Sequence, residues 1–288
     1  MKKIPGLLVF TFLLTTSFAQ NTILWSIQKP GSPQTSYVLG TFHQTGNSFV
    51  DGKPVIKELL LQSDIVIFES VEDKYEKVIN VMLQRPDDFS YREFLLKEDL
   101  EFLEKFSKYW KVPVSKQKPA ELLVKLQQEY VKMNCGGVKP TDTTSHMDDY
   151  LLSLARNNNV RTEGLESFAD QFEAINSING EDFTWEKAKD AVHVWVSNFQ
   201  DDKNQSEICG LTQAYLKLRL DYQFNAKCAE NDPILLKRNE KWMPLIKDFI
   251  QQNNSLMIIV GLYHLYGECG IISQLRKDGY TVKPVKLK

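Results

Sequence analysis

The apolar positions of the chain follow two different periods. Short runs rich in β-branched and aromatic residues, bounded by glycine, proline or asparagine, predict strands. These runs cover 22–27, 36–39, 64–68, 160–166 (a strand or a loop), 256–260 and 280–285. From about residue 75 to 245, apolar residues recur three and four positions apart, which predicts amphipathic helices. We therefore expect an α/β fold with a central mixed sheet built from the N- and C-terminal halves of the chain, and a helical insertion that covers it as a lid.

The first segments predict a β-hairpin followed by a β–α–β unit. The sequence 29–33, Lys-Pro-Gly-Ser-Pro, is typical of a turn between the first two strands. Residues 53–62 have helical spacing and lead into the apolar run 64–68, which ends at Glu69. Because both strands of such a unit end at the same edge of the sheet, we expect His43 and Glu69 to share one edge.

Within the helical region, several boundaries are predicted from caps and spacing. Capping residues at 142–145 precede one helix, and further helices are expected at 185–199 and 211–224, separated by a charged loop at 200–207. Another helix is expected to begin at Asp232 and to carry the pair Arg238 and Asn239.

The tetrapeptide signature Gly-x-x-His occurs twice, each time directly after an apolar run. Residues 40–43 are Gly-Thr-Phe-His and residues 261–264 are Gly-Leu-Tyr-His. Ligand sites of α/β folds gather outside the carboxyl ends of strands, so we expect His43 and His264 to meet there. Two glutamates, Glu69 and Glu166, follow strand-like runs in the same way.

Imidazole and carboxylate groups together suit a divalent transition metal with open positions for water and substrate. Such a metal polarises a carbonyl and activates water, which is hydrolytic chemistry. Glu166 is a candidate general base if it is not a ligand. A single histidine at a strand end is more often a hydrogen-bonded structural residue, and the chain has no HExxH motif, so the repetition of the signature is what favours a functional site.

The remaining candidates are weaker. His146 lies among helix-capping residues and is expected to be exposed, whereas His193 is expected at a partly buried helix position. Arg238, beside Asn239, is either a surface charge or a group that binds a peptide carboxylate or carbonyl. The chain has no GxSxG motif for a serine nucleophile and no phosphate-binding loop.

Residues 1–19 have the three-part layout of a secretory signal peptide. Two lysines precede an apolar run at 7–14, and Ser-Phe-Ala at 17–19 forms an expected cleavage site, which leaves 20–288 as a single domain with the helical insertion at about 75–245. The charge of this part is mildly acidic, which argues against nucleic acid or an anionic membrane as the main partner. No later run approaches the ~20 apolar residues of a transmembrane span. We therefore expect a periplasmic or secreted protein.

The four cysteines of an exported chain predict one or two disulfides. Cys135, Cys209, Cys228 and Cys269 allow three complete pairings, and the short loop between Cys209 and Cys228 favours that pair. The absence of CxxC spacing argues against a zinc site.

Several of these motifs, taken in order, resemble the TraB/GumN family, which includes the TIKI metalloproteases and is related to erythromycin esterases and ChaN-like haem-uptake proteins. The resemblance covers nearly all of the chain after residue 20. It rests on Leu24-Trp25, Tyr37–His43, Phe68-Glu69, Met147–Ala155, Gly164–Glu166, Gln171, Arg238-Asn239, Trp242, Gly261–Gly270, Leu275, Gly279-Tyr280 and Pro284.

The resemblance implies an α/β fold of two halves that each contribute a Gly-x-x-His, with a helical insertion. It implies a site containing His43, Glu69, Glu166 and His264, and it places Arg238 and Asn239 close by. The TIKI proteins are described as manganese- or cobalt-dependent proteases.

We therefore expect an exported metal-dependent hydrolase, first of all a peptidase. The expected ligands are His43, Glu69 and His264, with Glu166 as base or fourth ligand. Arg238, Asn239 and Gln171 are expected to bind a peptide or small-molecule substrate. Two alternatives stay open: a non-catalytic cleft protein that binds a peptide or small molecule, and a metal-free hydrolase of esters that uses a histidine as base.

Overall fold

The computed structural model describes residues 22–72, 74–177, 183–229, 232, 234–252 and 255–287. The expected signal peptide at 1–19 lies outside the described residues. Within the described part, every helix is too short or too polar to span a membrane.

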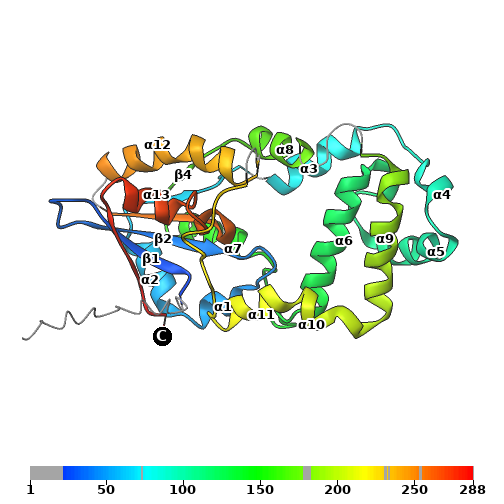
Figure 1. Cartoon of the computed structure of the whole chain (residues 1–288), viewed down its shortest axis with the longest axis horizontal. Coiled ribbons are helices and arrows are strands. Elements are labelled where there is room, and N and C mark those ends of the chain that lie inside the picture. The colour runs from blue at the N-terminus through cyan, green and yellow to red at the C-terminus, as the bar shows by residue number, and fades with distance from the viewer. Residues whose placement is uncertain are drawn as a thin grey trace, which may run out of the picture.

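Six strands form one mixed sheet, which confirms the predicted α/β fold. They are β1 (Leu24–Gln28), β2 (Thr35–Thr41), β3 (Ile65–Phe68), β4 (Arg161–Gly164), β5 (Leu256–Gly261) and β6 (Thr281–Pro284). The strand order is β4-β3-β5-β2-β1-β6, so both ends of the chain contribute to the sheet (Figure 1). The pairs from β4 to β2 are parallel, whereas β1 is antiparallel to both β2 and β6.

The parallel strands β3 and β5 lie at the centre of the sheet. All four residues of β3 and the first five of β5 are buried, as expected for strands covered on both faces. Their continuous apolar runs, Ile-Val-Ile-Phe and Leu-Met-Ile-Ile-Val, are therefore the sequence signature of this position.

The hairpin of β1 and β2 forms as predicted. Trp25 lies opposite Val38, and the turn is closed by the Ser32 amide, which donates to the Lys29 carbonyl at 3.1 Å. Gly31 has φ +74°, a conformation that glycine adopts without strain.

The helices of the described part surround this sheet and extend beyond it. They are α1 (Asn47–Asp51), α2 (Pro54–Gln62), α3 (Lys74–Leu83), α4 (Tyr91–Phe94), α5 (Lys97–Phe106), α6 (Pro119–Asn134), α7 (Met147–Asn157), α8 (Phe168–Ser177), α9 (Trp185–Gln200), α10 (Gln205–Ile208), α11 (Gly210–Leu216), α12 (Leu236–Gln252) and α13 (Ile271–Lys277). Single turns of 3-10 helix include η3 (Asp202–Asn204) and η4 (Leu262–Leu265).

Three predictions in the helical region are wrong. The helix expected to begin at Asp232 begins at Leu236. The expected helix 211–224 ends at Leu216, because Leu218 turns the chain at φ +54° and carries Leu220 and Tyr222 into the core. The expected charged loop at 200–207 contains η3 and the beginning of α10. For the helix expected at 211–224, burial of Leu220 and Tyr222 outweighed the local helical pattern.

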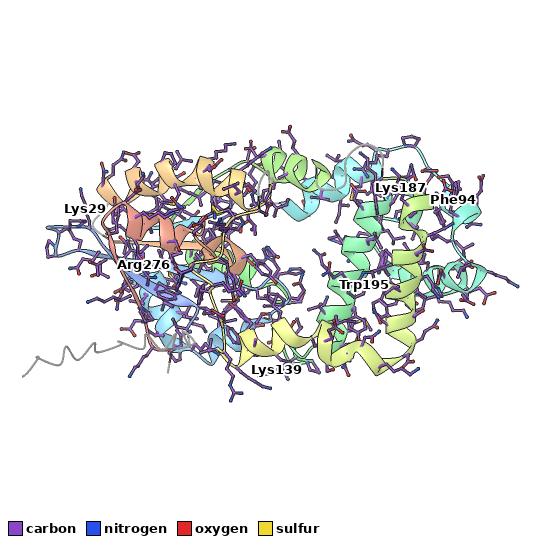
Figure 2. The ribbon with its side chains drawn as sticks, viewed as in Figure 1. Lys29, Phe94, Lys139, Lys187, Trp195 and Arg276 are labelled. Atoms are coloured by element: carbon purple, nitrogen blue, oxygen red, sulfur yellow. A yellow bond between two sulfur atoms is a disulfide. The ribbon has the colours of Figure 1, made fainter. Side chains whose placement is uncertain are left out.

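The helical part divides among three hydrophobic clusters of the described residues, the smallest of which is formed by Tyr130, Val131, Cys135 and Cys209. Residues of α7, α11, α12 and α13 pack in the same cluster as the sheet. A second cluster, which we call the distal cluster, joins α4, α5, α6 and α9, and Figure 1 shows the pair α6 and α9 at the end of the molecule opposite α12 and α13. Figure 2 shows Phe94, Lys187 and Trp195 in this distal part and Arg276 beside the sheet.

The disulfides join Cys135 to Cys209 and Cys228 to Cys269. The expected pair of Cys209 with Cys228 is therefore wrong. Cys135 caps the end of α6, and Cys209 lies where α10 meets α11, so the fold brings together two cysteines that are 74 residues apart. Closeness along the chain was not a guide to closeness in space.

Candidate functional site

The four parallel strands deliver the four central candidate residues to one edge of the sheet. His43 follows β2, Glu69 follows β3, Glu166 follows β4, and His264 lies in η4 directly after β5. Strands β2 and β5 are neighbours, with Thr41 opposite Gly261, so the two Gly-x-x-His signatures lie side by side with an offset of one residue.

The glycines of both signatures are explained by close packing at this edge. A Cβ atom on Gly40 would lie 2.9 Å from the side chains of Leu262 and Leu265. A Cβ atom on Gly261 would lie 3.2 Å from Glu69 Oε1. Each glycine therefore leaves room for an atom that a larger residue would push away.

Arg238, in the first turn of α12, is the centre of a buried ionic cluster. Its Nη2 lies 2.7 Å from Glu69 Oε2 and 2.6 Å from Glu166 Oε1, while Nε lies 3.1 Å from both Glu166 oxygens. Its Nη1 donates to the Ile234 carbonyl at 3.3 Å and to His264 Nε2 at 3.2 Å. A guanidinium has five N–H groups, and each of the five has a partner within the protein.

Burial opposes the charge of Arg238, but the hydrogen bonds and charges of Glu166 and Glu69 outweigh it and raise the pKa of the guanidinium. With 13 % of its side chain exposed, Arg238 acts as an internal counter-ion for two carboxylates. A substrate would have to displace one of these partners to reach it.

Glu166 is enclosed by donors. Its side chain is 1 % exposed, and Oε2 accepts from the indole Nε1 of buried Trp242 at 3.1 Å, in addition to Arg238. The Arg238 guanidinium also lies over the Trp242 ring, 4.5 Å from its centroid. Donors from the protein therefore occupy both carboxylate oxygens of Glu166.

Glu69 is held from three sides. Oε1 accepts from the Gly261 amide at 2.7 Å, and Oε2 accepts from Gln171 Nε2 at 3.0 Å and from Arg238. Gln171, on α8, therefore lies beside the ionic cluster as a partner of Glu69.

His264 is neutral, and its tautomer follows from its partners. Both hydrogens of the Asn239 amide are donated to carbonyls, those of His264 at 3.1 Å and Cys269 at 3.0 Å, so Asn239 Oδ1 is the acceptor for His264 Nδ1 at 2.7 Å. Nε2 then accepts from Arg238. Burial lowers the pKa of His264 to about 4, against the opposing charge of Glu69 and with help from Arg238 and His43.

We call these six residues the Arg238 cluster: Glu69, Glu166, Arg238, Asn239, Trp242 and His264. The amide of Asn239 is fully used in holding His264, so Asn239, like Arg238, has its donors directed into the protein.

His43 differs from His264 in being open to solvent. Its side chain is 51 % exposed, and Nδ1 lies 2.6 Å from Asp148 Oδ2. Asp148, in the first turn of α7, is also held by Thr41 Oγ1, which donates to Oδ1 at 2.7 Å. Burial raises the pKa of Asp148, but the charge and hydrogen bond of His43 outweigh it, so the pKa lies below its usual value. We call His43 and Asp148 the His43 pair.

Asp148 is the residue that the sequence analysis missed as part of a site. Its only local signal is a place in the first turn of a helix, where acidic residues are common for reasons of helix stability. Its partner lies 105 residues away, a distance over which sequence spacing carries no information.

His146 is half-buried at the N-cap position of α7, so the expectation that it is exposed is wrong. Burial lowers its pKa, while the charges of Asp149 and Asp148 oppose this and that of His43 adds to it. The charge of His43 lowers the pKa of both His146 and His264, so three of the four histidines of the chain lie near this edge. His193 lies in the distal cluster, half exposed, with Nδ1 3.0 Å from Asp99.

The residues of this edge do not fit a bound divalent cation as they are arranged here. Among the described residues, no three histidine, cysteine, aspartate or glutamate side chains are placed to hold a metal. His264 Nε2 and Glu69 Oε1 lie 3.8 Å apart, but Arg238 donates to that nitrogen and bridges the carboxylates. A second positive charge would be repelled by the guanidinium. The metal site stays a prediction.

The chain belongs to the TraB/PrgY/gumN family, because the model of this family matches residues 23–284, nearly the whole chain. This confirms the resemblance drawn from the motifs. No curated protein matches the chain significantly.

Proposed function

We propose that this protein is a hydrolase in which His43, held by Asp148, is the general base. The observation that carries the proposal is the 2.6 Å contact between His43 Nδ1 and Asp148 Oδ2 in a histidine side chain that is half exposed. A carboxylate at Nδ1 fixes the ring and its tautomer, so that Nε2 is the nitrogen that takes a proton from water or from a substrate hydroxyl. The negative charge of Asp148 stabilises the imidazolium that results. This arrangement suits metal-free hydrolysis of an ester or amide in a peptide or small molecule.

A second candidate is the metal-dependent peptidase that the family resemblance implies, with His43, Glu69 and His264 as ligands of manganese or cobalt. The observation that favours it is that both histidines direct Nδ1 to a fixing partner, Asp148 in one case and Asn239 in the other. Partners of this kind orient metal-bound imidazoles in many proteins. This candidate requires that Arg238 release His264 Nε2.

The test compares the wild-type protein with His43→Gln and Asp148→Asn on a panel of esters and peptides, with and without a chelator. We expect kcat to fall about 10²–10⁴-fold in His43→Gln while the fold is retained, because a general base contributes that much. The matched control is His193→Gln, which removes another histidine paired with an aspartate but lies in the distal cluster. Its activity should equal that of the wild type.

The outcomes separate the candidates. Activity that survives chelation and depends on His43 supports the metal-free hydrolase. Activity lost on chelation and restored by manganese or cobalt supports the metalloprotease. Saturable binding without turnover of any substrate would overturn both and leave a cleft protein that binds its ligand.

We also propose that the protein is exported, to the periplasm or beyond the cell. Two disulfides in one chain are typical of an oxidising compartment and support this location. N-terminal sequencing of the protein recovered outside the cytoplasm should begin at Gln20, and recovery of the intact N-terminus in the cytoplasm would contradict the proposal.

A further inference from the structure

The segment that carries His264 is folded tightly between β5 and α13. After η4 the chain turns at Gly267, which has φ +70°. A Cβ atom on Gly270 would lie 2.5 Å from the carbonyl group of Leu265, so the two ends of this turn are in direct backbone contact. Movement of Cys269, the residue before Gly270, would therefore be transmitted to His264.

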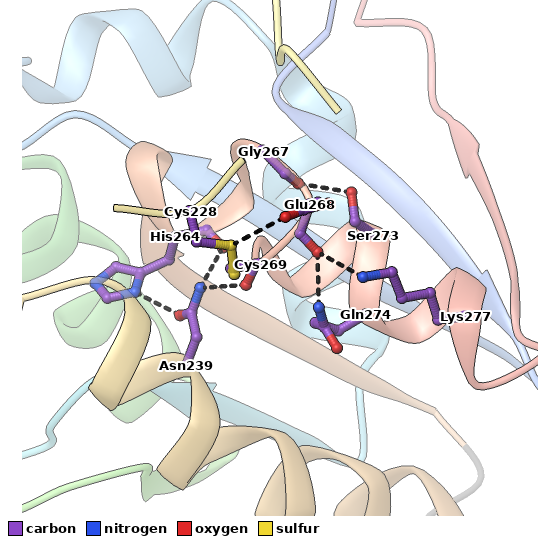
Figure 3. Close-up of a disulfide and its surroundings, with 9 residues drawn as sticks. All are labelled: Cys228, Asn239, His264, Gly267, Glu268, Cys269, Ser273, Gln274 and Lys277. Atoms are coloured by element: carbon purple, nitrogen blue, oxygen red, sulfur yellow. Dashed lines mark hydrogen bonds between the residues drawn. A yellow bond between two sulfur atoms is a disulfide. The ribbon is translucent and has the colours of Figure 1, made fainter. Parts of the chain in front are cut away.

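Asn239 joins three points of this segment through one amide group. It donates to the carbonyls of His264 and Cys269 and accepts from the His264 ring, as Figure 3 shows. Because a planar amide has fixed angles between its donors and its acceptor, both carbonyls must keep their places for the ring contact to keep its geometry. Asn239 is 3 % exposed, so water does not replace a lost contact easily.

The Cys228–Cys269 disulfide ties this segment to a strap formed by residues 222–228 (Figure 3). Two backbone contacts add to the covalent bond: the Gly267 amide donates to the Tyr222 carbonyl at 2.9 Å, and the Glu268 amide donates to the Ala226 carbonyl at 3.0 Å. Tyr222 is buried in the main core, where its hydroxyl donates to the Thr22 carbonyl at 2.7 Å. Most of the strap after Tyr222 is exposed, so the disulfide is what fixes its far end.

We propose that the Cys228–Cys269 disulfide positions His264. The bond fixes the Cys269 carbonyl, the carbonyl fixes the Asn239 amide, and the amide fixes the tautomer of the imidazole and its direction toward Arg238. The inference rests on the proposed function only for its activity readout, because His264 lies at the same sheet edge as His43, the proposed base, and interacts with its charge. It makes both cysteines positioning residues for His264.

The other disulfide provides a matched control. Cys135–Cys209 closes a loop of 74 residues and Cys228–Cys269 a loop of 41. The entropy of loop closure varies with the logarithm of loop length, so the two bonds are expected to stabilise the fold by similar amounts. A purely structural role would therefore give similar effects when either bond is removed.

The experiment uses the full chain with both cysteines of one disulfide replaced, C228S/C269S against C135S/C209S. The first readout is the ring nitrogen and Nδ1-proton NMR signals of His264 in histidine-labelled protein, assigned with His264→Gln. We expect C228S/C269S to shift or broaden these signals and to lower kcat with little change in KM, because the Cys269 carbonyl and the Asn239 amide lose their fixed places. C135S/C209S should leave the His264 signals as in the wild type.

Unchanged His264 signals in folded C228S/C269S, or equal changes in both double variants, would overturn the proposal. If C228S/C269S does not fold, Asn239→Ala with the disulfide intact tests the same link at its middle, and unchanged His264 signals there would also overturn it. The NMR readout needs no substrate. Absence of turnover in the wild type would therefore refute the proposed function, while the His264 signals would still decide the role of the disulfide.

Discussion

The Arg238 cluster and the His43 pair lie at the same edge of the sheet, yet they are built in opposite ways. In the Arg238 cluster, a buried guanidinium uses all five N–H groups on internal partners, and His264 is 3 % exposed. In the His43 pair, the Asp148 carboxylate holds an imidazole that is 51 % exposed. Two residues that are equivalent in the sequence signature therefore have different environments.

The repeated signature therefore specifies a place in the fold and does not specify a role. His43 is accessible to a substrate and has a carboxylate partner, which are the conditions for proton transfer. His264 is kept neutral by burial and accepts from Arg238, so in this arrangement it stabilises the ionic cluster.

The largest difference in stability is expected from Arg238→Met. The change leaves Glu69 and Glu166 buried without their counter-ion, which costs about 3–5 kcal/mol of the free energy of unfolding. Urea unfolding followed by circular dichroism measures the loss. His43→Gln, at the open side of the edge, should change the same free energy by no more than about 0.5 kcal/mol. Equal losses in the two variants would remove the distinction between the cluster and the pair.

The next effect concerns acid stability. The pKa of His264 is about 4 in the folded protein, below the ordinary value of 6.5, so between these values the unfolded state binds more protons than the folded state. The contribution of His264 to the free energy of unfolding is fully present above pH 6.5 and is lost as the pH falls to 4. The loss amounts to about 3 kcal/mol.

Urea unfolding at several pH values checks this contribution, since His264→Gln should show a shallower decline between pH 6.5 and 4 than the wild type. His193→Gln is the control. The hydrogen bond to Asp99 raises the pKa of His193 against the effect of burial, so the stability that this residue adds is lost only as the pH rises above 6.5. An unaltered decline in His264→Gln would show that other groups cause it.

The smallest effect is expected from Trp242→Phe. The ring is kept, but Glu166 Oε2 loses the indole donor at 3.1 Å, and a buried acceptor that loses a donor costs about 1–3 kcal/mol. The thermal unfolding midpoint measures the change. Tyr263→Phe removes a hydroxyl from an exposed residue at the same edge and should alter stability by about 0.5 kcal/mol at most. A Trp242→Phe midpoint equal to that of Tyr263→Phe would contradict the tight packing of Glu166.

Much of the fold could be predicted because its signals are local. The runs of β3 and β5 are apolar throughout, and the turn at 29–33 contains proline and glycine, so the strands and the hairpin were readable from the sequence. The helix expected at 211–224 failed because Leu218 adopts φ +54° so that Tyr222 reaches the core. The conformation of Leu218 depends on contacts between Tyr222 and distant segments of the chain.

The place of His43 and His264 at one edge of the sheet could be predicted, but the side chains that they and Arg238 contact could not. His43 and His264 could be expected at one edge, because each follows a strand. The pairing of His43 with Asp148 spans 105 residues, and that of Arg238 with Glu69 spans 169. Such pairs depend on strand order and helix packing, for which a single sequence has no periodic signal.

The two Gly-x-x-His strand ends and the carboxylates that follow β3 and β4 are encoded locally, since hydrophobic period and glycine are properties of neighbouring residues. The insertion of β5 between β3 and β2, which brings His264 and Glu69 against Arg238 and leaves His43 beside α7, follows from the packing of the whole chain. Burial and pairing of charges depend on which surfaces meet when the sheet and helices pack, and segments far apart in the sequence form those surfaces.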